Sequence, residues 1–180
     1  MTNWVIVFVR TGSEKKLVGK LKNILNREEY LPFFPVKEAP YRSKGVVTKI
    51  NKSLFPGYVF IETKIEPKLI AKNLRPVLLE NNCNKDIIKL LHYGSNINDV
   101  IVRDEERMQW GKLLDSDHRV SGSVGYIIGD MIHVISGALV GMEGEIKYVD
   151  RHKRLAIIEM TIMGEKRKVN LMLELIEKMK

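Results

Sequence analysis

The apolar periodicity of this chain stops between Leu114 and Ser123, where the sequence reads LDSDHRVSGS. Small and polar residues of this kind favour a flexible connector over a helix or a strand. The chain has 180 residues, a length that allows two small domains. We therefore expect one domain at residues 1–112, a flexible linker at 113–123 and a second domain at 124–180.

The first domain is expected to be an α+β sandwich that begins with a buried strand. Trp4–Val9 is apolar throughout, which is typical of a central strand covered on both faces. Apolar residues then recur at helical spacing from Leu17 to Leu25 and predict a helix over 13–27. Thr11–Glu14 fits the capping-box pattern at its start.

Further segments complete the order β-α-β-β-β-α-β-α. Strands are expected at 30–36, 46–55, 58–61 and 87–92, with a tight connection at Pro56-Gly57. One helix should start at Glu66-Pro67 and stop before Pro76. Another should run from Asp104 to Leu114, with Met108 and Leu114 facing inward and Trp110 near that face.

The second domain has a different pattern and predicts a small β-barrel. Short apolar runs alternate with turns at Ser136-Gly137, Asp150–Lys153 and Met163-Gly164. The runs are 131–135, 145–149, 155–161, 166–170 and 173–176.

The charge of the chain is basic, and the basic residues are unevenly spread. The net charge is +8 with a pI near 9.5, which makes a polyanionic partner plausible. Residues 123–180 hold nine basic and eight acidic side chains, yet seven of the nine form two clusters. These are Lys147 with Arg151, Lys153 and Arg154, and Lys166 with Arg167 and Lys168.

Two motifs resemble those of a known family. Phe55–Phe60 reads FPGYVF, similar to the F-P-G-Y-V signature of the NusG family of transcription elongation factors. Gly129–Ile146 is similar to that family's KOW motif. The order of the motifs and the Trp at position 4 extend the resemblance over nearly the whole chain. It implies an N-terminal NusG-type α/β sandwich joined to a C-terminal KOW domain, an SH3-like β-barrel.

The resemblance also implies a monomeric, cytoplasmic bacterial factor that binds RNA polymerase at the clamp helices of its largest subunit. The residues that it implicates in an apolar groove for those helices are Trp4, Phe55, Pro56, Gly57 and Tyr58. The alternative is that residues 55–58 only close a hairpin and fill a core, and that Trp4 belongs to the core of its strand.

Departures from the KOW pattern suggest a specialised member of the family. The usual Pro-Phe pair is Ala138-Leu139, and Met142 stands where an aromatic residue is common. The sequence looks most like the LoaP group of antiterminators, which act on long biosynthetic operons and recognise an RNA hairpin in the nascent leader. The alternatives are a general elongation factor whose KOW domain binds protein partners, and a free-standing KOW RNA-binding protein.

Basic residues are the candidates for nucleic-acid contact. Those expected to bind RNA, on one rim of the barrel, are Lys147, Arg151, His152, Lys153, Arg154, Lys166, Arg167 and Lys168. Those that could lie near upstream DNA or the non-template strand are Lys37, Arg42, Lys44, Lys49 and Lys52. A solvated loop and a solvated rim are the alternatives.

Catalysis, membrane insertion and metal binding are not expected. No phosphate-binding loop, nucleophile elbow or zinc-protease motif occurs, and no cofactor is predicted. No apolar run approaches the roughly 18–20 residues that span a bilayer, and the N-terminus does not read as a signal peptide. The single cysteine, Cys83, cannot form an internal disulfide, and the four histidines show no ligand spacing.

Overall fold

The computed structural model describes residues 2–80 and 85–176, so Cys83 lies outside the described residues. The chain forms two compact units. The first unit contains Met1–Pro35, Phe55–Arg107 and Ile162–Gly164. The second unit contains Val36–Leu54, Met108–Thr161 and Glu165–Lys180. The predicted domain limits at 112 and 124 stay a prediction.

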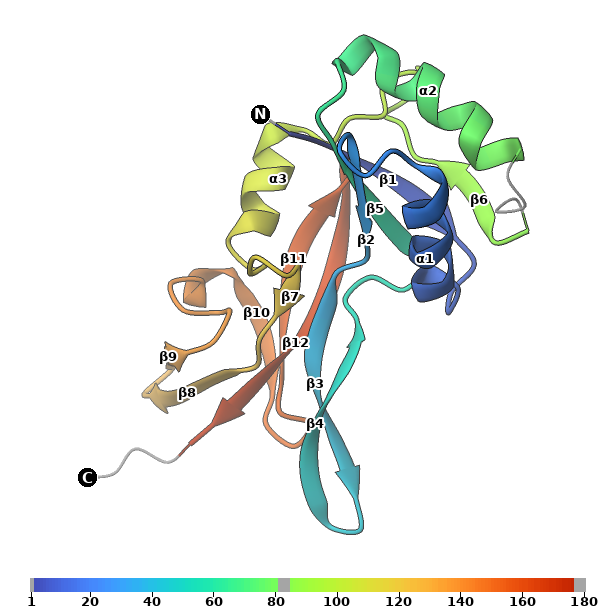
Figure 1. Cartoon of the computed structure of the whole chain (residues 1–180). Helices are drawn as coiled ribbons and strands as arrows, with labels where there is room; N and C mark the ends of the chain where they lie inside the picture. The colour runs from blue at the N-terminus through green and yellow to red at the C-terminus, as the bar shows by residue number, and fades with distance from the viewer. Residues whose placement is uncertain (1, 81–84, 177–180) are drawn as a thin grey trace. The chain divides into compact units, whose positions relative to one another are not determined.

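The first unit is built on a four-stranded antiparallel sheet. Its strand order is β2-β5-β1-β6, so β1 lies in the interior as predicted (Figure 1). Successive side chains of β1 are buried on both faces. The strands are β1 (Asn3–Val9), β2 (Tyr30–Phe33), β5 (Tyr58–Thr63) and β6 (Ile87–Leu90).

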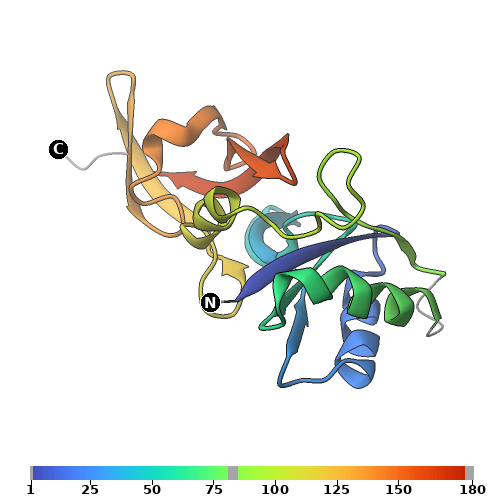
Figure 2. The ribbon, with the colours of Figure 1, turned by 90° about the horizontal axis from the view of Figure 1, so that it is seen from above.

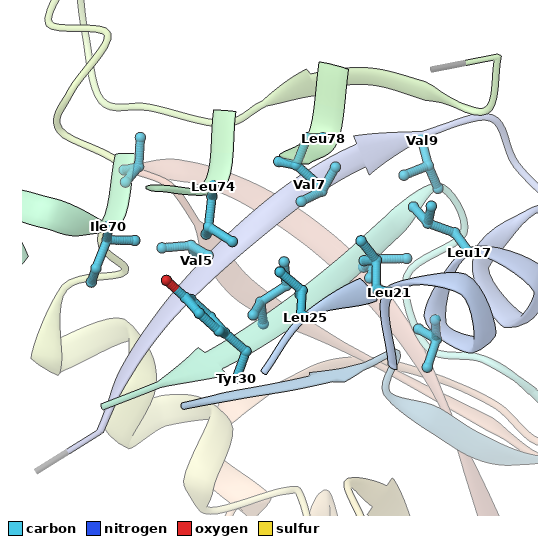
Figure 3. Close-up of a cluster of buried hydrophobic side chains, with 14 of the residues drawn as sticks. Val5, Val7, Val9, Leu17, Leu21, Leu25, Tyr30, Ile70, Leu74 and Leu78 are labelled. Carbon is cyan, nitrogen blue, oxygen red and sulfur yellow. The ribbon is translucent and has the colours of Figure 1, made fainter. Parts of the chain in front are cut away.

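Two helices, α1 (Glu14–Ile24) and α2 (Pro67–Glu80), cover one face of this sheet (Figure 2). Their apolar side chains meet alternate residues of β1 in one buried cluster, drawn in Figure 3. The labelled members are Val5, Val7, Val9, Leu17, Leu21, Leu25, Tyr30, Ile70, Leu74 and Leu78.

Helix α2 continues past Pro76, so the predicted end before this proline is wrong. Proline lacks the N–H that would bond to the preceding turn, which normally ends or kinks a helix. Leu74 and Leu78, one on each side of Pro76, are both buried in the core. Their burial offsets the missing hydrogen bond, since each buried leucine stabilises the fold by about 1.5–3 kcal/mol.

Helix α3 (Asp104–Gly111) also differs from its prediction. Met108 is 68% exposed, whereas Trp110 is fully buried, so Trp110 and not Met108 is the inward residue. The indole N–H of Trp110 donates to the Thr161 carbonyl at 3.2 Å. A buried indole needs such an acceptor, and this bond fixes the helix face that turns inward.

The second unit contains a long β-hairpin that the sequence did not predict as such (Figure 1). Strands β3 (Val36–Ser43) and β4 (Val46–Ser53) pair antiparallel around a two-residue turn at Lys44-Gly45. Both turn residues have positive φ, +47° and +80°, as a type I′ hairpin turn requires. Of the basic residues predicted to lie near DNA, Lys37, Arg42, Lys49 and Lys52 therefore lie on strands, and Lys44 lies in the turn.

The remainder of the second unit is a five-stranded sheet that forms a β-rich half-barrel. The strand order is β10-β11-β12-β8-β9, with β12 parallel to β8. The two apolar runs expected at 166–170 and 173–176 form one strand, and β8 was not expected. The strands are β8 (Ser123–Ile128), β9 (Met131–Ser136), β10 (Ile146–Asp150), β11 (Leu155–Ile162) and β12 (Glu165–Leu175), with a 3-10 turn at Glu143–Glu145.

The connection between β9 and the 3-10 turn depends on Gly137. Its φ is +92°, and a Cβ there would lie 2.3 Å from the Gly122 carbonyl oxygen. Leu139 and Met142, which depart from the KOW pattern, are both buried in the core that follows. Their side chains fill the interior instead of forming an exposed surface.

The segment expected to be a flexible linker contains local structure. The Asp115 carboxylate accepts hydrogen bonds from the backbone N–H groups of Asp117 and Arg119, at 2.9 and 2.8 Å. Strand β7 (Arg119–Val120) then pairs parallel with the start of β3. Flexibility of residues 113–123 stays a prediction.

Candidate polymerase and nucleic-acid surfaces

The face of the first sheet opposite the two helices carries an aromatic cluster. Trp4 packs edge-on against Phe33 and Phe60, with ring centroids 5.4 and 6.1 Å apart. Phe33 and Phe60 stack at 5.5 Å. Only 9% of Trp4 is exposed, so this residue contributes mainly to packing.

The turn that carries the F-P-G-Y motif divides its aromatic residues between core and surface. Phe55 is buried, Pro56 is exposed and Tyr58 is half-buried. Tyr58 packs against Phe8 at 5.3 Å and against Phe55 at 6.3 Å. Tyr58 and Phe8 are thus the aromatic pair of this turn that remains partly accessible. Phe8 was missed, although it shares a strand face with Trp4 by period-2 alternation.

Gly57 holds this turn close to β1. Its φ is +88°, its carbonyl accepts a hydrogen bond from the Val9 N–H at 2.8 Å, and an added Cβ would lie 3.2 Å from the Phe8 ring. The Gly57 N–H donates to the Glu14 carboxylate at 2.6 Å in a buried position. Glycine is required here both for its backbone conformation and for the close approach.

Glu14 therefore does not act in the predicted capping box. Helix α1 begins at Glu14, and the residue before it, Ser13, makes no side-chain cap. The Ser13 hydroxyl contacts Asp86 at 3.3 Å, and Lys16 pairs with the same carboxylate at 3.1 Å. The hydrogen bond and charge of Lys16 lower the pKa of Asp86. The local sequence contains no signal that the Glu14 carboxylate reaches a turn more than 40 residues away.

A basic groove in the second unit brings together residues from two predicted sets. The groove is a cavity of about 480 Å³ between the β3–β4 hairpin and the β10–β11 turn. Three of its basic residues were predicted to lie near DNA, and two basic residues and a histidine were predicted to bind RNA. They are Lys37, Arg42 and Lys52, and Lys153, Arg154 and His152. Lys44 and Lys49 do not line it.

Cations are crowded within this basic groove. Lys37 and Lys52 are directly opposite each other in the hairpin register. The Lys37 ammonium donates to the Asn170 carbonyl at 2.6 Å. Burial and the charge of Lys52 lower the pKa of Lys37. Like charges held opposite each other repel, and a bound polyanion would relieve that repulsion.

Carboxylates reduce the charge at the margins of the basic groove. Lys49 pairs with Glu38 at 3.1 Å, and Arg154 pairs with Glu174 at 2.7 Å. A hydrogen bond from the Gly122 N–H, together with Lys49, lowers the pKa of Glu38. Glu38 lines the groove itself, so these ion pairs offset part of its positive charge, while five lysine and arginine side chains still line it.

The two basic clusters of residues 147–168 do not share one rim, and that prediction is wrong. The Arg154 carbonyl accepts a hydrogen bond from the Leu173 N–H, near the end of β12. Lys166, Arg167 and Lys168 lie at its beginning. From Lys168 to Leu173 the strand extends about 17 Å at about 3.4 Å per residue. The topology separates the clusters because β11 runs between them as one strand of a hairpin.

The other residues predicted to bind RNA do not line the basic groove. Lys166 pairs with Glu159 at 3.2 Å, and Arg167 pairs with Glu165. Lys147 and Arg151 line a second cavity, of about 290 Å³, beside Tyr148. In the described part of the chain, no three His, Cys, Asp or Glu side chains are placed to hold a metal ion.

The comparison with family profiles agrees with the F-P-G-Y motif. Residues 2–109 match the family profile described as "Transcription termination factor nusG". A solved structure titled "Domain interaction in Thermotoga maritima NusG" is similar, with 21% identity, a TM-score of 0.43, and 96% of this chain and 94% of that chain covered. No curated protein matches.

Within the described residues, no helix is long and apolar enough to cross a membrane. The family match spans more than half of the sequence, including the F-P-G-Y turn and the aromatic cluster around Trp4. The chain therefore belongs to the NusG family of non-enzymatic transcription factors, whose members bind RNA polymerase.

Proposed function

We propose that this NusG-family chain is a specialised, LoaP-like antitermination factor that couples RNA polymerase to a nascent RNA hairpin. Its N-terminal domain, residues 1–112, binds the clamp helices of the largest polymerase subunit. Its C-terminal KOW domain, residues 124–180, captures the hairpin in the leader of a long biosynthetic operon, with the β3–β4 hairpin supplying the other wall of the RNA-binding groove, and residues 113–123 act as a tether. The observation that carries the proposal is the basic groove.

Polymerase binding is attributed to the accessible side of the F-P-G-Y turn. Tyr58 and Phe8 form a partly exposed aromatic pair, and exposed Pro56 extends the apolar surface. An aromatic side chain is an effective anchor because it buries a large area and freezes few torsions. Trp4 and Phe55 support this surface from the buried side.

RNA capture is attributed to the charge of the basic groove. Five lysine and arginine side chains line the groove, together with His152, and Glu38 is the only acidic residue among its lining residues. Cations in such a groove release condensed counterions when they contact phosphates. A hairpin presents phosphates at high density, and Arg42 or Arg154 can also contact a guanine where a loop opens the helix. Non-template DNA is the competing ligand.

A general elongation factor with protein partners is the second candidate. It is favoured by exposed apolar side chains around the β8–β9 hairpin. These are Ile128, Met131, Ile135 and Val140. Leu139 and Met142 do not argue against this candidate, because both are buried and cannot change the exposed surface directly.

Sequencing of RNA crosslinked to the full-length protein in cells would distinguish the two candidates. A specialised factor should enrich one or a few leaders, and Lys37→Ala combined with Lys52→Ala should abolish that enrichment. Lys15→Ala combined with Lys22→Ala, on the exposed side of α1, is the matched control. Uniform recovery of transcripts in proportion to their abundance would contradict the RNA-reading function and support the general factor.

A further inference from the structure

The second cavity of the second unit lies beside Tyr148 and is separate from the basic groove. It measures about 290 Å³ and lies between the β8–β9 turn and strand β10. Gly129 and Asp130 line it from the turn, and Lys147, Tyr148 and Arg151 line it from β10 and the residue that follows. We call it the Tyr148 hollow.

Tyr148 is exposed, although it lies in a strand. The residue is 59% exposed. By contrast, Tyr126 of β8 stacks on His133 at 5.2 Å. No other ring within residues 2–80 and 85–176 packs against Tyr148. More than half of Tyr148 is therefore accessible to a ligand, with no aromatic ring of the described residues competing for it.

The backbone holds Tyr148 in this position. Strand β10 is at the edge of the five-stranded sheet. Its pairing with β11 shifts register between Ile146 and Tyr148, where consecutive pairs are Ile146 with Ile158 and Tyr148 with Ile157. An irregularity of this kind leaves Lys147 as an extra residue and redirects the side chains that follow it.

The charges around the Tyr148 hollow favour one chemical class of ligand over others. Lys147 and Arg151 are cations that favour a ligand attached to a polyanion, whereas the Asp130 carboxylate disfavours a phosphate inside the hollow. The same carboxylate can accept hydrogen bonds from the N–H groups of a base.

We infer that the Tyr148 hollow is a stacking site for an unpaired nucleobase of RNA. This inference rests on the proposed function and adds a base-stacking residue to it. The turn 151–154 connects the two sites, because Arg151 lines the Tyr148 hollow while His152, Lys153 and Arg154 line the basic groove. One RNA strand can therefore place phosphates in the basic groove and an unpaired base on Tyr148.

The test compares full-length proteins on two defined probes, a single-stranded RNA of about 12 nucleotides and the duplex of the same strand. Duplex pairing removes the bases from reach and leaves the phosphates available. We expect the wild-type protein to prefer the single strand, and Tyr148→Leu to bind it about tenfold more weakly, as expected for loss of one base–aromatic stack. Tyr148→Phe should retain the affinity, because it keeps the ring.

Two further readouts separate stacking from charge. The slope of log affinity against log salt should be the same for Tyr148→Leu and wild type, since the substitution leaves every phosphate-binding cation in place. An RNA containing 5-iodouridine should photocrosslink to Tyr148. Tyr41, which is 50% exposed and lines neither cavity, gives the control Tyr41→Leu, which should bind as wild type does.

The outcomes separate the two proposals. If the wild type binds both probes but Tyr148→Leu binds the single strand equally well, the stacking site is wrong and the RNA-binding function stands. That result is also expected if Tyr148 anchors a protein partner. If the wild type binds neither probe at low salt, the proposed function fails together with the stacking site.

Discussion

Glu14 links the first turn of α1 to the F-P-G-Y motif through one buried hydrogen bond. Its carboxylate accepts the Gly57 N–H at 2.6 Å. In Glu14→Ala the buried N–H loses its partner, a change that typically costs about 1–3 kcal/mol of unfolding free energy. Urea denaturation should show this loss. Glu28→Ala, at an exposed carboxylate, should change the unfolding free energy by less than about 0.5 kcal/mol. Equal effects of the two substitutions would contradict this role of Glu14.

Lys37 gives a pH-dependent prediction. Burial and the charge of Lys52 lower the pKa of Lys37, so its charged form costs stability in the folded protein. The cost is full below the lowered pKa and disappears as pH rises toward 10.5, the ordinary value for lysine. The unfolding free energy of the wild type should therefore rise with pH relative to that of Lys37→Met. Chemical denaturation of both proteins at pH 7 and pH 10 measures the difference. If the difference in unfolding free energy between the two proteins is the same at pH 7 and pH 10, the charge of Lys37 does not destabilise the folded protein.

At the scale of elements, the turn between β4 and β5 separates packing residues from accessible ones. Tyr58→Ala and Phe8→Ala should each weaken association with RNA polymerase by more than about 1 kcal/mol, as truncated aromatic anchors often do. Phe55→Ala should instead lower the unfolding free energy by about 3–5 kcal/mol, because Phe55 is buried. Polymerase pull-down titration combined with thermal unfolding distinguishes the two effects. Unchanged polymerase binding by a folded Tyr58→Ala protein would exclude Tyr58 from the polymerase-binding surface.

The β3–β4 hairpin and the β10–β11 turn should act together in RNA binding. Replacing Arg42, Lys52 and Lys153 with Ala should lower the salt slope by about 0.7–0.9 for each phosphate that is no longer neutralised. The same number of substitutions at Lys166, Arg167 and Lys168 should have less effect, since two of those side chains pair with nearby carboxylates. Fluorescence anisotropy with a hairpin RNA, over a salt range of about 50–300 mM, measures both slopes. A larger fall in the salt slope for the Lys166, Arg167 and Lys168 variant would assign the phosphate contacts to residues 166–168 and not to the basic groove.

For the whole molecule, the pairing of β3 with β7 predicts that residues 1–112 alone do not reproduce the complete hairpin. The Val36 N–H donates to the His118 carbonyl at 3.2 Å, and the Gly122 N–H donates to Glu38. Neither bond can form in a chain that ends at residue 112. Hydrogen exchange at Val36 should be faster in that fragment than in the full chain, while exchange at Ile6, in the buried β1, stays slow in both. Equal protection of Val36 would show that β7 does not stabilise the hairpin.

The sequence predicted those elements whose pattern is local. Trp4–Val9 is an apolar run and forms the interior strand, and the short runs after residue 130 form strands as expected. Strand β3 was missed because Pro40 and several charged residues weaken the strand pattern. Pro40 is tolerated because β7 pairs only with Val36 and Lys37, which leaves the other edge of β3 open at residue 40.

The basic groove could not be predicted from the sequence, because its two walls come from segments about one hundred residues apart. Lys37 and Lys52 belong to the hairpin, whereas Lys153 and Arg154 belong to the β10–β11 turn. Local pattern identified both sets as basic but gave no sign of their proximity. The local pattern also placed Lys166–Lys168 on the same rim as the 151–154 turn, which is wrong. A period-2 pattern gives the face of the strand on which a side chain lies, but not the end of the sheet at which the residue lies.

The parallel pairing of β3 with β7 also has a consequence during translation. Strand β3 ends at Ser43, and β7 begins only at Arg119. The hairpin therefore leaves the ribosome well before its third strand has been synthesised. During that interval the nascent chain exposes an open strand edge, a recognised template for unwanted pairing. The charged side chains of Lys37 and Arg42, on β3 itself, disfavour such pairing at that edge until synthesis reaches β7.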